Sequence, residues 1–454
     1  MSNFDRLFAE KHGGGALTKI YAWHIDPNES DPESAVTYLE DAVGMTPAKM
    51  TADGFDYGSW AGAFFMPKPC MLKFDGTVDY YLDPDDYSKK ADGTPSDYNN
   101  LSYEGNVMLE FPKIWYKFVA GEAAGEGYFY VSNRKIDDTY HCWCNYDSLN
   151  HEIDHFYMAA YNGCIYDGKL RSISGLKLTP WSTTAYSASS TYNVGAKVHY
   201  GNNMYQCTTA VTEAEPFDPE KWEQFAYNGM TDGTQEVNAA LAMNTKSSPE
   251  WYTGVLADRQ LITGLLTLMS KSLDSQGKFG RGVDSGSRAA KVAYITGSLD
   301  DKGLFYGSTT NGSTAVKTFG MENFWACCWH RTAGLVGANN GFRYKLTYGT
   351  ADGSEATSYN SNDANYNLLV STKPGANYIS KMVYGNHGFM PLSVSGGSAS
   401  KYYCDYYYNG NGFAVFGGSS GYGARYGVWC LDLSSAFGIR DWSIAASPSC
   451  KPLA

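Results

Sequence analysis

The clearest hydrophobic pattern in the chain predicts a helix within the segment 238–275. Apolar residues recur there every three or four positions, as they do along one face of an α-helix. The stripe consists of Leu261, Leu265, Leu268, Met269 and Leu273, widened by Ile262 and Leu266. Gly277 follows the stripe and is a natural end for the helix. We expect this helix to pack on a sheet in the core of the second half.

A second helix is predicted near residue 31. Asp31 suits the N-cap and Pro32 the first turn. The residues Ala35, Tyr38, Leu39 and Ala42 then fall on one helical face. The segments 55–118 and 128–174 instead read as short strands separated by turns.

Composition adds that the protein is β-rich, of the all-β or the α+β class; with the predicted helix we expect α+β. The chain has 49 Gly and only 18% charged residues, which indicates many turns and long ordered loops. A net charge of −12 argues against a nucleic-acid partner, because phosphate binding needs a basic surface. No apolar run is long enough to span a bilayer, so we expect no membrane insertion. The N-terminus MSNFDRLFAEK lacks the apolar core of a signal peptide, so we expect synthesis in the cytoplasm.

Metal binding is not expected, although two short patterns raise the question. Residues 151–155, HEIDH, match the HExxH zinc motif, which works only on a helix. Here the motif precedes the strand-like FYMAAYNGCIYDG, so we interpret it as a chance match. The acidic group Asp83, Asp85 and Asp86 lacks the spacing of a calcium loop and is interpreted as a solvated turn. The 10 Cys include no CxxC pair, and we expect mostly free, buried thiols and no cofactor.

The segment 384–450 is crowded with tyrosine among Ser, Gly and Asn. This is the composition of a binding surface, where Tyr gives contact area at low entropic cost and small polar residues adapt their hydrogen bonds. A Tyr-rich β-sheet face is the alternative interpretation. The expected receptor-binding residues are Tyr402, Tyr403, Asp405, Tyr406, Tyr407, Tyr408, Asn409, Ser419, Ser420, Tyr422, Arg425, Tyr426 and Trp429.

Residues 181–226 form a compositional island that resembles small chitin-binding-type carbohydrate-binding modules of families 5 and 12. The matching features are Tyr192-Asn-Val-Gly195, Val198, Tyr200-Gly201, Met204-Tyr205-Gln-Cys207, Pro219 and Trp222. The resemblance implies a small β-unit inserted into a larger domain. Its expected sugar-binding residues are Trp181, Tyr186, Tyr205 and Trp222. A bare spacer is the alternative role.

The segment 318–353 carries a second resemblance. Gly320-Met-Glu322-Asn323-Phe324-Trp325, then Trp329 and Gly334, are similar to the G-x-x-N-x-x-G-N-x-W-E-W segment. That segment marks the C-type-lectin-like fold of formylglycine-generating enzymes and of the variable proteins of diversity-generating retroelements. The chain has Ala326-Cys327-Cys328 where the family has Gly-Asn before the second Trp. Downstream, 385–391 and 427–429 resemble the variable region of the retroelement proteins.

The resemblance implies three domains. We expect a β-rich virion-attachment region at 1–98, a lectin-like receptor-binding domain at 99–180 and 227–454, and the inserted module at 181–226. By this resemblance the chain is a phage tail-tip or tail-fibre adhesin that binds a bacterial surface glycan or protein. The implied assembly is a homotrimer in contact with other tail proteins, made in the host cytoplasm and carried in the virion.

Two other functions stay open at this point. The first is a structural tail protein whose Tyr-rich face contacts another virion subunit. The second is an oxidase of the formylglycine-generating type, which needs a reactive pair of cysteines late in the chain. Cys327 and Cys328 lie in the structural segment instead, and Cys430 and Cys450 are far apart in sequence, so we expect no enzyme.

Overall fold

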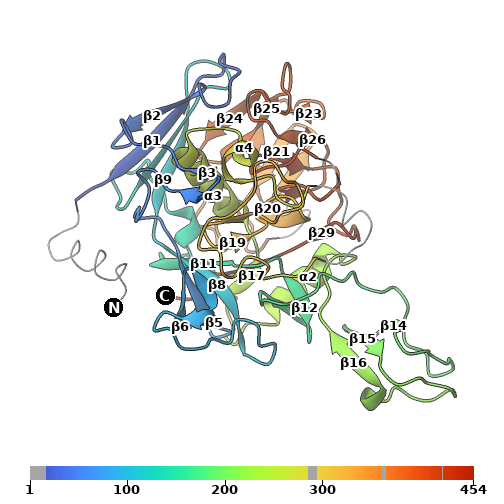
Figure 1. The fold of residues 1–454 in the computed structure, drawn as a ribbon. Coiled ribbons are helices and arrows are strands. Elements are labelled where there is room, and N and C mark those ends of the chain that lie inside the picture. Colours follow the sequence, from blue (N-terminus) through green and yellow to red (C-terminus); the bar gives the residue numbers. More distant parts are fainter. Residues whose placement is uncertain (1–16, 285–293, 360–363, 422) are drawn as a thin grey trace.

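The computed structural model describes residues 17–284, 294–359, 364–421 and 423–454 (Figure 1). A single long helix, α3 (Leu256–Ser270), lies in the middle of the body, and all of its residues are buried. It packs against strands of more than one sheet. Strands far outnumber helices, which confirms the β-rich class predicted from composition.

Three large sheets build the body. The strands of the four-stranded sheet, in spatial order, are β2 (Val36–Glu40), β1 (Ile20–Ile25), β10 (Gly127–Ser132) and β9 (Trp115–Ala120). The seven-stranded sheet runs β17 (Trp251–Thr253), β30 (Pro448–Cys450), β11 (His155–Ala159), β8 (Gly105–Pro112), β5 (Lys68–Lys73), β6 (Val78–Asp83) and β7 (Asp86–Lys90). The eight-stranded sheet runs β22 (Asn367–Val370), β21 (Gly341–Tyr344), β20 (Trp329–Ala338), β27 (Phe413–Phe416), β28 (Leu431–Asp432), β26 (Tyr406–Tyr408) and β23 (Asn377–Tyr378), with β29 (Ile444–Ala445) beside β20.

Smaller elements complete the chain. The two-stranded pairs are β3 (Lys49–Thr51) with β4 (Gly54–Asp56), β12 (Cys164–Tyr166) with β13 (Lys169–Arg171), β18 (Lys317–Thr318) with β19 (Met321–Glu322), and β24 (Lys381–Gly385) with β25 (Gly388–Ser393). The short helices are α2 (Gly233–Leu241), α4 (Ser275–Phe279), and the 3-10 turns Trp143–Asn145 and Pro219–Lys221. None of the helices in the described residues is long and apolar enough to cross a membrane.

The boundary expected between residues 98 and 99 does not separate two sheets. Strand β5 pairs with β8 along its whole length, and β1 pairs with β10. Strand β30 from the end of the chain lies between β17 and β11. Residues from the beginning, middle and end of the sequence therefore share the same sheets.

The helix expected after Asp31 is wrong. The Asp31 carboxylate accepts hydrogen bonds from the backbone N–H groups of Glu33 and Ser34, so it does cap one turn. The chain then extends into β2, which pairs antiparallel with β1. The β-branched and aromatic run Val36, Thr37, Tyr38 favours a strand, and the Tyr38 hydroxyl donates to the Leu268 carbonyl of α3 at 2.7 Å. Tertiary pairing outweighs the local helix signal.

The helix predicted within 238–275 is confirmed in its central part only. Residues Leu261 to Met269 lie in α3 and are buried on all sides, rather than along one stripe. The flanking segment before α3 includes the strand β17, and Gly277 lies inside α4 instead of ending a helix. The end is set by Lys271, which adopts the left-handed conformation with φ of 50°.

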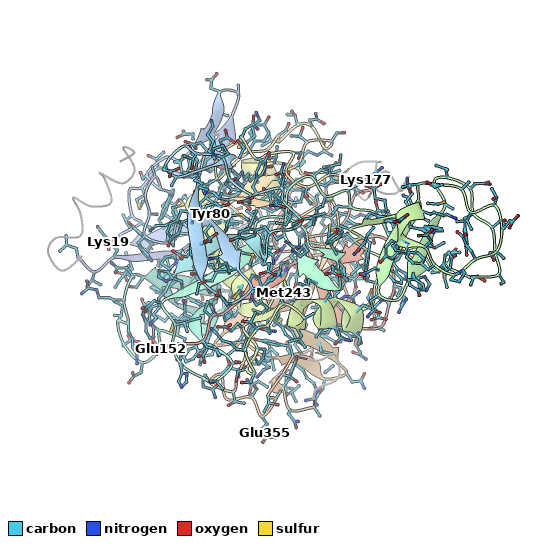
Figure 2. The ribbon with its side chains drawn as sticks, turned by 90° about the horizontal axis from the view of Figure 1, so that it is seen from below. Lys19, Tyr80, Glu152, Lys177, Met243 and Glu355 are labelled. Atoms are coloured by element: carbon cyan, nitrogen blue, oxygen red, sulfur yellow. The ribbon has the colours of Figure 1, made fainter. Side chains whose placement is uncertain are left out.

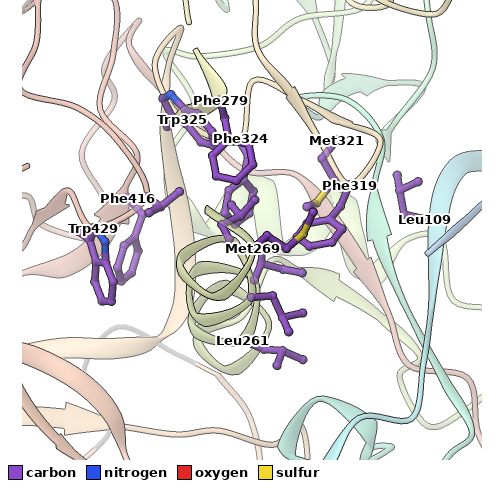
Figure 3. Close-up of a cluster of buried hydrophobic side chains, with 14 of the residues drawn as sticks. Leu109, Leu261, Met269, Phe279, Phe319, Met321, Phe324, Trp325, Phe416 and Trp429 are labelled. Carbon is purple, nitrogen blue, oxygen red and sulfur yellow. The ribbon is translucent and has the colours of Figure 1, made fainter. Parts of the chain in front are cut away.

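The core around α3 draws on distant segments. Figure 3 shows Met269 of α3 beside Phe319 and Phe324, with Phe416 and Trp429 of the C-terminal region on another side of the helix. Trp325 is fully buried, and its indole N–H donates to the Gly280 carbonyl at 3.1 Å. Trp325 is therefore part of the hydrophobic core.

Residues 181–226 form a separate small unit on the side of the body. Its sheet consists of β14 (Lys197–Tyr200), β15 (Asn203–Cys207) and β16 (Trp222–Phe225). The unit projects away from the three large sheets in both views (Figures 1 and 2). The two segments that join this unit to the body lie side by side, because the Trp181 N–H donates to the Gly229 carbonyl and the Asn228 N–H donates to the Thr179 carbonyl.

Candidate functional site

The thirteen residues expected to form a binding face divide between the core and the surface. The buried ones are Tyr403, Asp405, Tyr407, Ser419, Ser420, Tyr426 and Trp429. The half-buried or exposed ones are Tyr402, Tyr406, Tyr408, Asn409 and Arg425. Tyr422 lies outside the described residues. The structure thus corrects the expectation of a single exposed face that includes all thirteen.

Strand geometry explains the division within the tyrosine run. Successive side chains of a strand point to opposite faces. In β26, Tyr407 is fully buried and its hydroxyl donates to the Asn409 side chain at 3.2 Å. Tyr406 and Tyr408 lie on the other face and are half-buried, with ring centroids 4.6 Å apart. The two interpretations of the tyrosine-rich stretch therefore each apply to one side of the same strand.

Trp429 and Tyr403 belong to the hydrophobic core. The Trp429 ring lies 4.6 Å from Phe389 and 5.0 Å from Tyr403, centroid to centroid. The Tyr403 hydroxyl is 2.6 Å from the hydroxyl of Tyr384, so each buried phenol has a partner. These side chains hold the sheet on α3 and are not available to a ligand in this structure.

The buried polar residues among the thirteen hold neighbouring segments of the chain together. The Asp405 carboxylate accepts a hydrogen bond from the Trp429 backbone N–H at 2.8 Å, and burial raises the pKa of Asp405 well above its usual value. Ser420 N–H donates to the Cys327 carbonyl at 3.2 Å, and Ala326 N–H donates to the Gly417 carbonyl at 2.8 Å. Residues 417–420 are thereby fixed to the segment that contains Ala326 and Cys327.

Three of the half-buried or exposed members, Tyr406, Tyr408 and Arg425, lie together near the edge of the eight-stranded sheet. Tyr378 of β23 lies directly opposite Tyr406 of β26, with ring centroids 5.3 Å apart. The Arg425 guanidinium lies 5.2 Å from the centroid of the Tyr406 ring. We call Tyr378, Tyr406, Tyr408 and Arg425 the outer cluster. The ring of Trp329 lies beside the cluster, 5.9 Å from the Tyr408 ring.

Tyr378 was missed by sequence reasoning. It precedes the tyrosine-rich run and stands alone between small and polar residues, so composition gives no signal. Only the pairing of β23 with β26 brings it to Tyr406.

The inserted unit has its own aromatic core. Trp222 is buried, and its ring lies 5.1 Å from Tyr192 and 5.5 Å from Tyr186. Trp181 is also buried, at the root of the unit, between His199 and Tyr227. The expectation that Trp181 and Trp222 present their rings to a sugar is therefore corrected, because both indoles fill the interior. Tyr186 and Tyr205 are half-buried.

A different pair of rings faces solvent on this unit. Tyr200 is 51% exposed, and its ring stacks on Phe217 at 4.2 Å with an interplanar angle of 11°. Tyr200 is the last residue of β14 and directly precedes the turn at Gly201. The Tyr-Gly pair was noted in the sequence without being assigned to the candidate sugar site.

The HEIDH segment does not build a zinc site. It is extended, and His155 is the first residue of β11. The His151 ring lies 3.1 Å from the Asp147 carboxylate, and the His155 ring lies 3.9 Å from Glu110, so the two imidazoles have separate partners. Within the described ranges, no group of three or more His, Cys, Asp or Glu is placed to hold a metal ion.

All ten cysteines are buried free thiols, as expected. Burial raises the pKa of Cys430 and of Cys450 well above the usual value of a thiol. A protonated thiol is a poor nucleophile. The two late cysteines thus have the environment of structural residues.

Comparison with known proteins adds no relative. No profile of a known protein family matches the chain, and no curated protein is similar to it in sequence. The candidate site therefore rests on geometry.

Proposed function

We propose that the chain is a phage tail adhesin that binds a bacterial surface receptor through the outer cluster. The observation that carries the proposal is the placement of Tyr378, Tyr406 and Arg425 together at the exposed edge of a rigid sheet. Aromatic and Arg side chains dominate binding surfaces when a rigid scaffold presents them. Strand β26, which carries Tyr406, has its inner face buried against the core through Tyr407.

A lectin-like frame is the proposed scaffold, and the backbone of the 318–329 segment supports it. Ala326 and Cys327 both adopt positive φ, at 61° and 55°. These are the positions at which the resembling segment has Gly-Asn, the residues that adopt this conformation most readily. Arg259 of α3 donates to the Phe324 carbonyl at 2.6 Å and fixes the segment to the central helix. Positive φ at Ala326 and Cys327 is the conformation that Gly and Asn would favour at these two positions.

The further parts of the proposal follow the same resemblance. The protein functions without enzymatic activity, as a homotrimer in the virion tail, and Tyr406, Tyr408 and Arg425 of the outer cluster belong to the region that diversity-generating retroelements vary. The inserted unit presents Tyr200 and Phe217 as a second, smaller aromatic surface. The buried state of the ten thiols gives no support to an oxidase.

Binding of the purified, labelled protein to a panel of whole bacteria tests the proposal. We expect Tyr406→Ala and Tyr378→Ala to reduce cell binding about tenfold or more, since truncation of an aromatic anchor costs about 2 kcal/mol. Both variants should keep the wild-type melting temperature. Tyr81→Ala is the matched control, because Tyr81 is 37% exposed on β6 of a different sheet.

A second comparison separates contact from folding. Trp429→Ala removes a side chain that is 1% exposed, so it should unfold early and lose binding only as a consequence. If wild-type protein binds no cells but binds another tail subunit, the structural alternative is correct. If it binds cells and neither Tyr406→Ala nor Tyr378→Ala weakens the interaction, the receptor site lies elsewhere.

A further inference from the structure

The charges around the outer cluster differ from those of the rest of the chain. The whole protein has 35 basic and 47 acidic side chains. From residue 364 to residue 439, in contrast, the basic residues are Lys373, Lys381, Lys401 and Arg425, and the acidic ones are Asp405 and Asp432. Asp405 is 2% exposed and held in a backbone hydrogen bond. The segment that contains the cluster thus has four basic and two acidic residues, whereas the whole chain has a net charge of −12.

One cation lies beside β26 and a second lies near the residues that follow the strand. Arg425 is exposed, and its backbone carbonyl accepts from the Tyr406 N–H, which places the guanidinium beside the strand. Lys373 lies just beyond the other end of the strand, where its ammonium donates to the Asn411 side-chain oxygen at 2.6 Å. Asp432 is a partly exposed carboxylate opposite Tyr408 in the sheet, and burial raises its pKa.

The cluster also has the parts that recognise a sugar. The rings of Tyr378 and Tyr406 are accessible in part, and phenol rings offer an apolar face together with a hydroxyl. An exposed guanidinium offers five donors in a fixed fork that matches a carboxylate or a phosphate. An Arg held between aromatic rings loses little further freedom when it forms that pair.

We propose that the outer cluster selects an acidic surface polysaccharide, with sugar rings packed on Tyr378 and Tyr406 and a carboxylate or phosphate group paired with Arg425. This inference rests on the proposed adhesin function and adds the chemical class of the receptor. The acidic remainder of the protein repels a polyanion, so the basic region also directs the approach of the polymer to this edge. A neutral glycan gains neither the ion pair with Arg425 nor this electrostatic attraction.

The test uses the full chain and defined probes. Biolayer interferometry would compare oligogalacturonate, which carries carboxylates, with the same oligomer as its methyl ester, which is neutral and has the same backbone. Phosphorylated mannan and unmodified mannan form the second pair. We expect the acidic member of at least one pair to bind at least tenfold more tightly than its neutral partner, and raised salt to reduce that preference. A preference in the first pair identifies the recognised group as a carboxylate, and a preference in the second pair identifies it as a phosphate.

Variants of Arg425 link the preference to the cluster. Arg425→Gln should reduce the preference for the acidic probe over the neutral one about tenfold, as expected for the loss of a charge-assisted pair. Arg425→Lys should keep part of the preference. Lys68→Gln, a change of a basic residue on β5 of another sheet, is the control and should have no effect. Melting temperatures of all three variants should equal that of the wild type, because Arg425 is exposed.

Whole-cell binding then separates this inference from the function on which it rests. The inference is overturned if cells are bound but Arg425→Gln binds them as well as wild type, or if neither acidic oligomer competes with the cells. It is also overturned if the acidic and neutral probes bind equally. If no cells are bound at all, the adhesin function itself fails. Competition by an acidic oligomer, lost in Arg425→Gln, supports both.

Discussion

The buried ion pair between Lys451 and Asp258 gives the sharpest test of how the fold is closed. Lys451 follows the last strand, β30, and its ammonium lies 2.6 Å from the Asp258 carboxylate in the first turn of α3. The two side chains are 0% and 1% exposed. The ammonium also donates to the Cys144 carbonyl at 2.6 Å, and Ser449 donates to the second Asp258 oxygen at 3.1 Å.

Lys451→Met removes the charge and keeps most of the volume of the side chain. Asp258 is then left as a buried carboxylate with Ser449 as its remaining side-chain donor. Removing one partner of a buried pair costs about 3–5 kcal/mol, because an uncompensated charge stays in the interior. Because the unfolding entropy is about 2.1 cal/mol/K per residue, a chain of 454 residues shifts by about 1 °C per kcal/mol, and the melting temperature should fall by roughly 3–5 °C. Unfolding in urea, followed by tryptophan fluorescence, measures the loss.

Two further variants decide whether this explanation is correct. Lys451→Met combined with Asp258→Leu should recover most of the loss, since an apolar pair avoids the desolvation of two charges. Lys73→Met is the control, because the Lys73–Asp79 pair has a similar distance of 2.8 Å but side chains that are 45% and 31% exposed. It should cost less than about 1 kcal/mol. The reasoning fails if Lys451→Met costs no more than this control, or if the double variant is less stable than the single one.

Three other predictions concern the backbone, pH and the inserted unit. Ala326→Gly should change the free energy of unfolding by less than about 0.5 kcal/mol, because relief of the positive φ at Ala326 offsets the lost methyl group. Ala257→Gly inside α3 should lower the free energy of unfolding by about 2 kcal/mol in the same urea assay. Burial lowers the pKa of Lys317 to about 8, so the folded state binds fewer protons than the unfolded state above that pH. The stability of wild type relative to Lys317→Met should therefore rise by up to about 1.4 kcal/mol per pH unit between pH 8 and 10, and a flat difference would refute it. Deletion of residues 182–225 should leave the main thermal transition within a few degrees of wild type, because the ends of the unit are hydrogen-bonded to each other; loss of that transition would make the unit part of the core.

Local chemistry was enough to predict several features. The apolar spacing from Leu261 to Met269 predicted the central helix, because that spacing matches the helical repeat. The composition of residues 181–226 marked an island, its resemblance to small carbohydrate-binding modules implied a small β-unit, and these residues have their own sheet and aromatic core in the structure. The absence of paired cysteine motifs predicted buried free thiols. Each of these depends on properties of neighbouring residues in the chain.

Other features were decided only by tertiary contacts. The turn at Asp31 continues as β2 because β1 offers a pairing edge and α3 accepts the Tyr38 hydroxyl. Burial separated Tyr407, Tyr426 and Trp429 from Tyr406, although all share the same tyrosine-rich composition. The outer cluster needs Tyr378, which reaches Tyr406 only across a strand pair. The sequence by itself therefore determined which residue types were available for binding. Which of them face solvent was decided by the sheet, because a strand turns successive side chains to opposite faces and the core can cover only one of them.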